Sequence, residues 1–342
     1  MTETKPFLEN AWYMAAWSHE VGEDMLRRRL LGEPILLMRR QDGTAAALVD
    51  RCPHRYAPLS KGEREGDTIV CPYHGLTFDA AGQCVRNPFS EKIPAGAQLR
   101  SFPVVERDHI VWFWPGDPAR AEETPVPDFS AIVIDGHAPI TGVMPMAANY
   151  EYGTDNLMDL SHIEFVHKGT FAGRGVIFAG THEVKAQGDQ LHSNWWMPAI
   201  PAPAHTFGIY DPAMITDHWL DMRWEAPASM YLQVGACPQG GDRAEGVIAH
   251  QAHILTPETE GSSHYFWATT RQGPPSPEGD AMLAGLMGAA FGEEDKPIIE
   301  AAYANTDGAD FWERKPLSLG IDTGGTRARR IIEKRKKEEA AL

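Results

Sequence analysis

Two short stretches decide how this sequence folds and what it binds: Cys52-Pro53-His54 and, after a gap of sixteen residues, Cys71-Pro72-Tyr73-His74. Each stretch brings one thiol and one imidazole together. The prolines within them and the glycine that follows the second favour loops rather than helix or strand. Two thiols and two imidazoles on neighbouring loops are a donor set for a metal centre.

Two kinds of metal centre use this donor set. In a Rieske [2Fe–2S] cluster, cysteines hold one iron and histidines hold the other, so Cys52, His54, Cys71 and His74 would supply all four ligands. A structural zinc ion accepts the same set. However, Cys-x-His followed by Cys-x-x-His is not ordinary zinc-finger spacing, so the sequence favours the cluster and zinc remains the alternative.

A second candidate metal site lies in the segment 149–168, which contains Asp159, His162 and His167. Two imidazoles and a carboxylate on one helix are compatible with a metal ion, and also with a helix that simply has a polar face. Apolar residues recur every three positions and predict that helix: Leu157, Leu160, Ile163 and Val166.

Both motifs resemble those of one family, the Rieske non-haem iron oxygenases. The stretches 51–55 and 71–79 resemble the cluster loops of that family, and the pattern Asp-Asn-x-Met-Asp-x-x-His-x-x-x-x-His, which begins at Asp155, resembles its mononuclear iron site. The two motifs occur in the order and spacing of the family. The resemblance covers nearly the whole chain and is closest to oxygenase components of the vanillate O-demethylase and dicamba monooxygenase type.

The resemblance assigns a role to each matching residue. His162 and His167 correspond to the two iron-binding histidines. The third ligand in the family is an aspartate on a downstream helix, and Asp295 matches it, with Glu294 as the second choice and a solvated helix start as the alternative. Such a triad of two histidines and one carboxylate leaves one face of Fe(II) open for dioxygen and substrate.

Three further residues take roles from the same resemblance. Asp159 corresponds to a bridging aspartate, which would accept hydrogen bonds from His162 and from the cluster histidine of a neighbouring subunit, matching His74. Asn156 lies one turn before Asp159 and is placed near the open face of the iron. His253 lies where relatives can use a histidine for substrate contact, although an ordinary core or surface histidine fits equally.

The predicted fold is α+β, with an all-β Rieske domain in residues 1–118 and a catalytic domain in 119–342. Turns at Gly43 and Gly82 predict hairpins in the first domain. The second domain resembles the family's helix-grip arrangement, an antiparallel sheet around a long helix. Strands are predicted over 139–147, 246–255 and 264–270, and mainly helix over 277–305. The basic segment 326–337 predicts a helical, solvated tail.

The resemblance also implies a reaction and partners. The expected activity is an O2-dependent O-demethylation of a vanillate-like methoxylated aromatic, giving a phenol and formaldehyde. The alternative is a hydroxylase or N-demethylase of another small aromatic or cyclic substrate. No Gly-x-Gly-x-x-Gly motif follows a predicted strand, so NADH oxidation is expected in a separate flavin and iron–sulfur reductase. The family resemblance implies a homotrimer.

Composition excludes several other classes. The net charge of −16 argues against nucleic acid and against anionic membrane surfaces. No apolar run approaches the roughly 20 residues of a membrane helix, and the first residues lack the apolar core of a signal peptide. We therefore expect a cytoplasmic protein, with Cys84 and Cys237 as buried free thiols.

Overall fold

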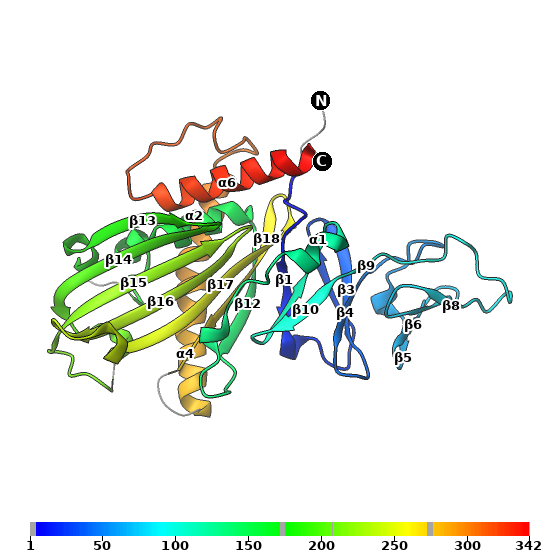
Figure 1. The fold of residues 1–342 in the computed structure, drawn as a ribbon, viewed down its shortest axis with the longest axis horizontal. Helices are drawn as coiled ribbons and strands as arrows, with labels where there is room; N and C mark the ends of the chain where they lie inside the picture. The colour runs from blue at the N-terminus through cyan, green and yellow to red at the C-terminus, as the bar shows by residue number, and fades with distance from the viewer. Residues whose placement is uncertain (1–4, 172–174, 207, 272–275, 342) are drawn as a thin grey trace. The chain divides into compact units, whose positions relative to one another are not determined.

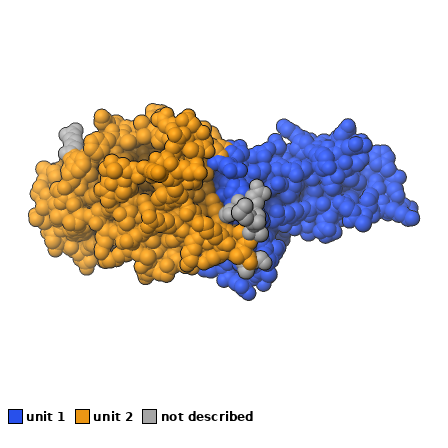
Figure 2. Space-filling view, turned by 90° about the horizontal axis from the view of Figure 1, so that it is seen from above, with its two compact units in different colours: residues 1–128, 256–260, 342 blue, residues 129–255, 261–341 orange. Residues whose placement is uncertain are grey.

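A computed structural model describes residues 5–171, 175–206, 208–271 and 276–341. The chain forms two compact units, coloured separately in Figure 2. The first comprises residues 1–128 with 256–260, and the second comprises residues 129–255 with 261–341. Residues 119–128, which follow the predicted boundary at residue 118, therefore belong to the first unit by their contacts. No helix among the described residues is long and apolar enough to cross a membrane.

The first unit contains three small antiparallel sheets. Their strand orders are β1-β11-β10, β2-β3-β4-β9 and β5-β6-β7-β8. The β3–β4 hairpin turns at Gly43, whose φ of 87° confirms the predicted turn. The elements are β1 (Tyr13–Trp17), β2 (Leu26–Leu30), β3 (Glu33–Arg39), β4 (Ala45–Val49), β5 (Glu63–Glu65), β6 (Thr68–Val70), β7 (Thr77–Asp79), β8 (Cys84–Arg86), β9 (Ser101–Phe102), β10 (Val104–Arg107), β11 (Ile110–Phe113) and α1 (Pro118–Glu123).

The sheet β5–β8 supports the two Cys/His loops. One loop precedes β5 and the other connects β6 to β7. Ile69 and Phe78 are fully buried beneath them and anchor the sheet to the core. The β7–β8 turn at Gly82 has a φ of 86°, and a Cβ there would lie 2.4 Å from the Leu99 carbonyl oxygen. The position therefore requires glycine.

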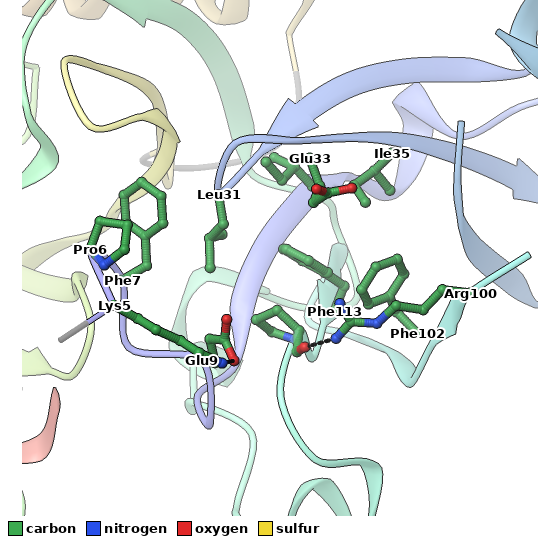
Figure 3. Close-up of a pocket in the computed structure, with 12 residues that line it drawn as sticks. Lys5, Pro6, Phe7, Glu9, Leu31, Glu33, Ile35, Arg100, Phe102 and Phe113 are labelled. Carbon is green, nitrogen blue, oxygen red and sulfur yellow. Dashed lines mark hydrogen bonds and ion pairs between the residues drawn. The ribbon is translucent and has the colours of Figure 1, made fainter. Parts of the chain in front are cut away.

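A pocket of 130 Å³ opens in the first unit beside the N-terminal segment and β3 (Figure 3). Its charged side chains are already bound within the unit. Lys5 donates to Glu9 at 2.5 Å, and Arg100 donates to the Pro115 carbonyl oxygen. None of the lining residues is a candidate metal ligand.

The second unit is built on a seven-stranded antiparallel sheet with the order β12-β18-β17-β16-β15-β14-β13. Figure 1 shows its strands side by side, with α4 crossing one face. This arrangement confirms the expected fold class. The strands are β12 (Ile140–Met146), β13 (Thr181–Gln187), β14 (Gln190–Pro201), β15 (Ile215–Glu225), β16 (Ser229–Pro238), β17 (Val247–Thr259) and β18 (Ser262–Thr269).

Two cross-strand glycine–tryptophan pairs let large rings lie flat against this sheet. Gly235 pairs with Trp219 between β15 and β16, and Gly142 pairs with Trp267 between β12 and β18. A Cβ would come within 2.0 Å of the Trp219 ring and 2.3 Å of the Trp267 ring. Since both tryptophans are buried, the missing Cβ atoms are what make room for them.

The helices of the second unit carry the candidate site. The predicted helix over 277–305 forms, but it changes pitch in a π-helical segment at Ala290–Asp295. The α-helices are α2 (Tyr150–Met158), α3 (Ile163–Val166), α4 (Pro277–Ala289), α5 (Lys296–Ala304) and α6 (Thr323–Ala340).

The C-terminal helix α6 is not the solvated tail that its basic sequence predicts. Arg329 is 4% exposed, and its guanidinium donates to the carboxylates of Asp155 (2.6 Å) and Glu151 (2.9 Å) on α2. Gly325 allows close approach, because a Cβ there would lie 2.6 Å from Asp155. One residue of the basic run, Arg329, therefore binds α6 to α2 through buried ion pairs. The buried side chain of Ile332 adds an apolar contact.

Candidate metal sites

The two Cys/His loops share one backbone turn. The Cys52 amide donates to the Ala57 carbonyl oxygen at 2.9 Å, and the Cys71 amide donates to the Leu76 carbonyl oxygen at 2.8 Å. Each cysteine carbonyl then accepts from the residue four positions later. The prolines after each cysteine donate no amide hydrogen and fix φ, which favours these loops over strand pairing.

Each turn ends at a residue whose backbone adopts the left-handed conformation. Tyr56 has a φ of 60° and Gly75 a φ of 71°. Glycine adopts this conformation freely, whereas a tyrosine does so only when its surroundings hold it there. The first loop therefore carries backbone strain at the position where the second uses glycine.

The two thiols of the Cys/His loops lie beside one another, and so do their two imidazoles. Cys52 and Cys71 are 1% and 3% exposed. Burial, together with the Cys71 thiol beside it, raises the pKa of the Cys52 thiol to about 11. The rings of His54 and His74 lie 4.5 Å apart. The buried Nδ1 atom of His74 has no hydrogen-bond partner among the described residues. A buried imidazole nitrogen without a partner fits a metal ligand.

The surface around these histidines is aromatic. The Tyr73 ring stacks on His74 at 4.1 Å, and the Phe89 ring meets it edge-on at 6.5 Å. Tyr73 is 63% exposed and Phe89 is 77% exposed. Such exposed rings beside a metal centre indicate a contact surface.

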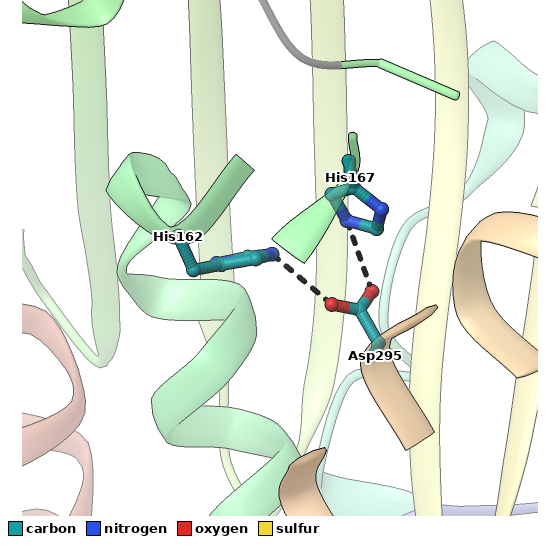
Figure 4. Close-up of side chains that lie close together, drawn as sticks. All are labelled: His162, His167 and Asp295. Atoms are coloured by element: carbon teal, nitrogen blue, oxygen red, sulfur yellow. Dashed lines mark ion pairs between the residues drawn. The ribbon is translucent and has the colours of Figure 1, made fainter. Parts of the chain in front are cut away.

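The second donor set comes from the two ends of α3 and from the π-helical segment, and the three side chains meet at one point (Figure 4). His162 Nε2 lies 3.3 Å from Asp295 Oδ1, and His167 Nε2 lies 3.2 Å from Asp295 Oδ2. One ligand atom from each residue lies within 4.8 Å of the others. His167 and Asp295 are each 2% exposed. Two imidazoles and one carboxylate on one side of a point form the facial arrangement of non-haem iron sites.

The predicted helix over 149–168 is interrupted at Asp159. α2 ends at Met158, Asp159 has an extended φ of −126°, and a single 3-10 turn precedes α3. The cause is local, because Asp159 Oδ1 accepts from the Ser161 amide at 3.0 Å and from its hydroxyl at 2.6 Å. This capping restarts the helix in a new direction.

The interruption corrects the hydrogen bond expected between Asp159 and His162. His162 Nδ1 lies 2.6 Å from the main-chain carbonyl oxygen of Asp159, not from its carboxylate. That carbonyl only accepts, so Nδ1 carries the proton and Nε2 is left as the metal-facing nitrogen. Both hydrogen bonds described for the carboxylate use Oδ1, which leaves Oδ2 for a donor from outside the chain.

Glu294, the second choice for the third ligand, supports His167 instead. Its Oε2 lies 2.9 Å from His167 Nδ1, and its Oε1 accepts from the Gly169 amide at 2.7 Å. A carboxylate on Nδ1 fixes the tautomer that presents Nε2 to a metal. Although burial would raise the pKa of Asp295, the neighbouring imidazoles of His162 and His167 hold it below its usual range. The facing carboxylate is therefore ionised.

The π-helical segment explains how adjacent acids serve one site. Its wider turn ends at Asp295, and Pro297 follows in the first turn of α5 without an amide donor. Asn156, at the end of α2, donates to Asp295 Oδ1 at 3.3 Å. Asn156 therefore contacts one member of the triad, and its place near the iron stays a prediction.

Two residues that the sequence gave no reason to select hold the end of α2. Ser193 donates its hydroxyl to the Met158 carbonyl oxygen at 2.8 Å, and His182 Nε2 lies 2.8 Å from that hydroxyl. The His182 ring stacks on Trp195 at 4.6 Å. Because the Ser193 hydroxyl donates its hydrogen to the Met158 carbonyl oxygen, its oxygen accepts a hydrogen bond from His182 Nε2. These residues fix the carbonyl that immediately precedes Asp159.

His253 lies in the core rather than at the surface. It is 1% exposed, and burial lowers its pKa to about 4. Its Nδ1 lies 2.7 Å from the Tyr265 hydroxyl and its Nε2 lies 3.2 Å from Gln251 Oε1. The Phe291 ring meets it edge-on at 5.2 Å, one turn before Asp295.

Comparison with known proteins agrees with both donor sets. The Rieske [2Fe-2S] domain family matches residues 11–103, and the vanillate O-demethylase oxygenase C-terminal domain family matches residues 146–338. Those ranges contain the Cys/His loops and the His162, His167, Asp295 triad, respectively.

Whole-length relatives share this architecture. The chain is 38% identical to the dicamba O-demethylase oxygenase component of Stenotrophomonas maltophilia, over 98% of this chain and 99% of the relative. It is 36% identical to the chloroacetanilide N-alkylformylase oxygenase component of Rhizorhabdus wittichii, over 97% of both. A crystal structure of dicamba monooxygenase bound to dicamba matches with a TM-score of 0.90 and 37% identity, covering 98% of this chain and 99% of that one.

These findings define an iron-dependent oxidoreductase with a Rieske domain and a separate catalytic domain. The chain belongs to the Rieske non-haem iron oxygenases and is an oxygenase component of the vanillate O-demethylase type. Its cofactors are a Rieske [2Fe–2S] cluster and a mononuclear non-haem iron. The expected family, enzyme class and cofactors are confirmed.

Proposed function

We propose that this chain catalyses the O2-dependent O-demethylation of a methoxylated aromatic compound. The substrate R–O–CH3 takes one oxygen atom into its methyl C–H bond, while two electrons and two protons reduce the other atom to water. The resulting hemiacetal R–O–CH2OH then breaks into the phenol R–OH and formaldehyde. The observation that carries the proposal is the convergence of His162, His167 and Asp295 in a chain related to O-demethylases.

Each donor set has one role in this proposal. Cys52, His54, Cys71 and His74 hold the cluster, and His162, His167 and Asp295 hold the iron. When bound, the iron supplies the activation of dioxygen for oxygen transfer. Glu294 fixes His167 through Nδ1, the Asp159 carbonyl oxygen fixes His162 through Nδ1, and Asn156 orients the Asp295 carboxylate.

The carboxylate of Asp159 is the proposed contact between the two kinds of metal site. It stands beside His162 at the interruption of the helix and has Oδ2 available to a donor from outside the chain. In a head-to-tail homotrimer, the partner subunit's His74 would meet it. Exposed Tyr73 and Phe89 beside the cluster histidines support such a contact, and a closed ring of identical contacts satisfies every subunit.

Native mass spectrometry tests the assembly. We expect a complex of three times the 37.8 kDa chain mass. A fully active monomer would contradict the proposed homotrimer.

A separate reductase supplies the electrons from NADH in this proposal. We also propose a cytoplasmic location, which the buried free thiols Cys84 and Cys237 support.

Product analysis tests the reaction. The purified protein, loaded with iron and cluster, is combined with NADH, a surrogate reductase and a panel of methoxylated aromatics. Formaldehyde released in step with a demethylated phenol is the expected result. Hydroxylated product without formaldehyde would favour the hydroxylase reading. Aldehyde released from an N-alkyl compound would favour N-dealkylation, which the 36% identity to an N-alkylformylase supports as the second candidate.

A further inference from the structure

The C-terminal helix α6 packs against α2, the helix that leads into the iron ligands (Figure 1). Both helices belong to the second compact unit, which also holds the metal-ligand triad. The contacts follow one another in opposite order along the two helices: Gly324 with Met158, Arg329 with Asp155 and Lys336 with Glu151. The contact therefore extends over most of α2 and reaches its last residue, Met158.

Buried charges hold the middle of α2. Arg329 Nη2 lies 2.6 Å from Asp155 Oδ2, and its Nη1 lies 2.9 Å from Glu151 Oε2. The Tyr152 and Phe311 rings lie 4.8 Å and 3.9 Å from the guanidinium carbon. Because the Arg329 side chain is only 5% exposed, breaking these pairs would leave a buried charge without a partner. The ion pairs therefore oppose any sliding of α2 along α6.

Close packing holds the end of α2. A Cβ at Gly324 would lie 2.9 Å from the Met158 carbonyl oxygen and 3.2 Å from the Met158 Cβ. The Ser193 hydroxyl donates to the same carbonyl oxygen at 2.8 Å. On the sheet side, a Cβ at Gly153 would lie 2.8 Å from a Leu255 methyl group of β17. The end of α2 is therefore packed closely by α6 and by the sheet.

This end of α2 carries supports for two of the three iron ligands. Asn156 donates to Asp295 Oδ1 at 3.3 Å. Asp159, the residue after Met158, presents its carbonyl oxygen to His162 Nδ1 at 2.6 Å. A displacement of the Met158 carbonyl would move both supports together. Groups that orient metal ligands in this way contribute to metal affinity.

We propose that α6 is part of the iron site, with Gly324 and Arg329 as positioning residues that hold the end of α2 and, through it, His162 and Asp295. Both residues act through α2, by way of Met158 and Asp155. A change at either position should weaken iron binding, whereas the cluster should persist because its loops lie in the other unit. The inference holds for any substrate of the enzyme.

The iron affinity of Gly324→Ala tests the packing contact. Alanine is a better helix former than glycine, so the substitution favours α6 itself while its Cβ displaces the Met158 carbonyl oxygen. We expect the Kd for Fe(II), measured by chelator competition on the full-length protein, to rise about tenfold. Cluster absorbance should not change. Gly285→Ala on α4 is the matched control, because nothing lies within 4 Å of the new Cβ.

Arg329→Gln and Arg329→Lys test the ion pairs. Glutamine removes the charge, whereas lysine keeps it but lacks the planar fork that binds two carboxylates. We expect the Kd for Fe(II) to be highest in Arg329→Gln and intermediate in Arg329→Lys. Arg330→Gln, at the exposed neighbouring position, should bind iron as the unaltered protein does. If Arg329→Gln fails to fold, Arg329→Lys and Gly324→Ala decide the question.

Urea unfolding of the same proteins separates positioning from a general loss of stability. Ile254→Val shortens a buried side chain of β17 on the face of the strand opposite to Leu255. It should lower the free energy of unfolding and leave iron affinity unchanged. Iron affinity that falls in step with stability in every variant, Ile254→Val included, would overturn the proposal. Unchanged iron affinity in both Gly324→Ala and Arg329→Lys would overturn it as well.

Discussion

The two metal sites are built in opposite ways. The cluster donors occupy two loops within 23 residues of one another, from Cys52 to His74, and both loops repeat one backbone turn. The iron donors come from α3 and its flanking turns and from a π-helical segment that begins more than a hundred residues later. The cluster site is therefore specified locally, whereas the iron site depends on the packing of a whole domain. The difference predicts which changes each site tolerates.

The largest expected effect follows from removing one iron ligand. His162→Ala should abolish product formation, because two remaining donors hold iron weakly, while the cluster absorbance persists because its loops lie in the other unit. Iron analysis should fall from about three to about two atoms per chain. His137→Ala, an exposed histidine of the same unit, is the control. Loss of the cluster spectrum in His162→Ala would mean that the two sites are not independent.

Asp159→Asn should affect the connection between the sites rather than either site. Its main-chain carbonyl still binds His162 Nδ1 and its amide oxygen can still cap Ser161, so both metals should remain. Product formation should fall by about 100-fold, because the proposed carboxylate contact with the cluster histidine is lost. The rate of cluster oxidation in a single turnover measures electron transfer between the two sites directly. Undiminished, fully coupled turnover would exclude the bridging role.

The residues alone single out the four cluster donors, because these lie in two short motifs, and they leave zinc as an alternative. The roles of His162 and His167 as iron ligands come from the family resemblance, since two imidazoles on a helix also fit a polar face. Asp295 required the family resemblance, since Glu294 beside it offers the same chemistry. Only the π-helical turn decides that Asp295 faces both histidines while Glu294 binds His167 from behind.

The sequence did not predict features that depend on contacts between residues far apart in the chain. Ser193 and His182 have no motif, and they become important because β13 and β14 pass the end of α2. Arg329 looked like one charge in a basic tail, and its burial depends on Asp155, 174 positions earlier. His162 binds the main-chain carbonyl of Asp159 rather than its carboxylate, because that carboxylate accepts hydrogen bonds from Ser161. The domain boundary at residue 118 stays a prediction.

Glu294→Gln sharpens the comparison within the iron site. The amide keeps the shape of the side chain but weakens its hold on His167 Nδ1, so iron affinity should fall by about 10- to 100-fold. Chelator competition measures this affinity. Glu293→Gln, at the neighbouring position, is the matched control. An unchanged affinity in Glu294→Gln would show that His167 needs no support from this carboxylate.

The smallest effect is expected in the local site, through backbone geometry alone. Gly82→Ala should lower the free energy of unfolding by about 1–3 kcal/mol, because alanine meets both a φ of 86° and the Leu99 carbonyl oxygen. Gly43→Ala has a similar φ of 87° but nothing within 4 Å of the new Cβ, so it isolates the conformational cost. Denaturant unfolding followed by cluster absorbance compares them. Equal losses would show that the Leu99 contact contributes nothing.

Anomalous X-ray scattering at the iron edge tests the account most directly, because it locates each metal independently of turnover. In crystals of the iron-loaded protein, we expect a strong two-iron peak among Cys52, His54, Cys71 and His74. A weaker single-iron peak should lie among His162, His167 and Asp295. Absence of the second peak, or a zinc-edge signal in place of the first, would contradict the assignment of an oxygenase with two separate iron sites.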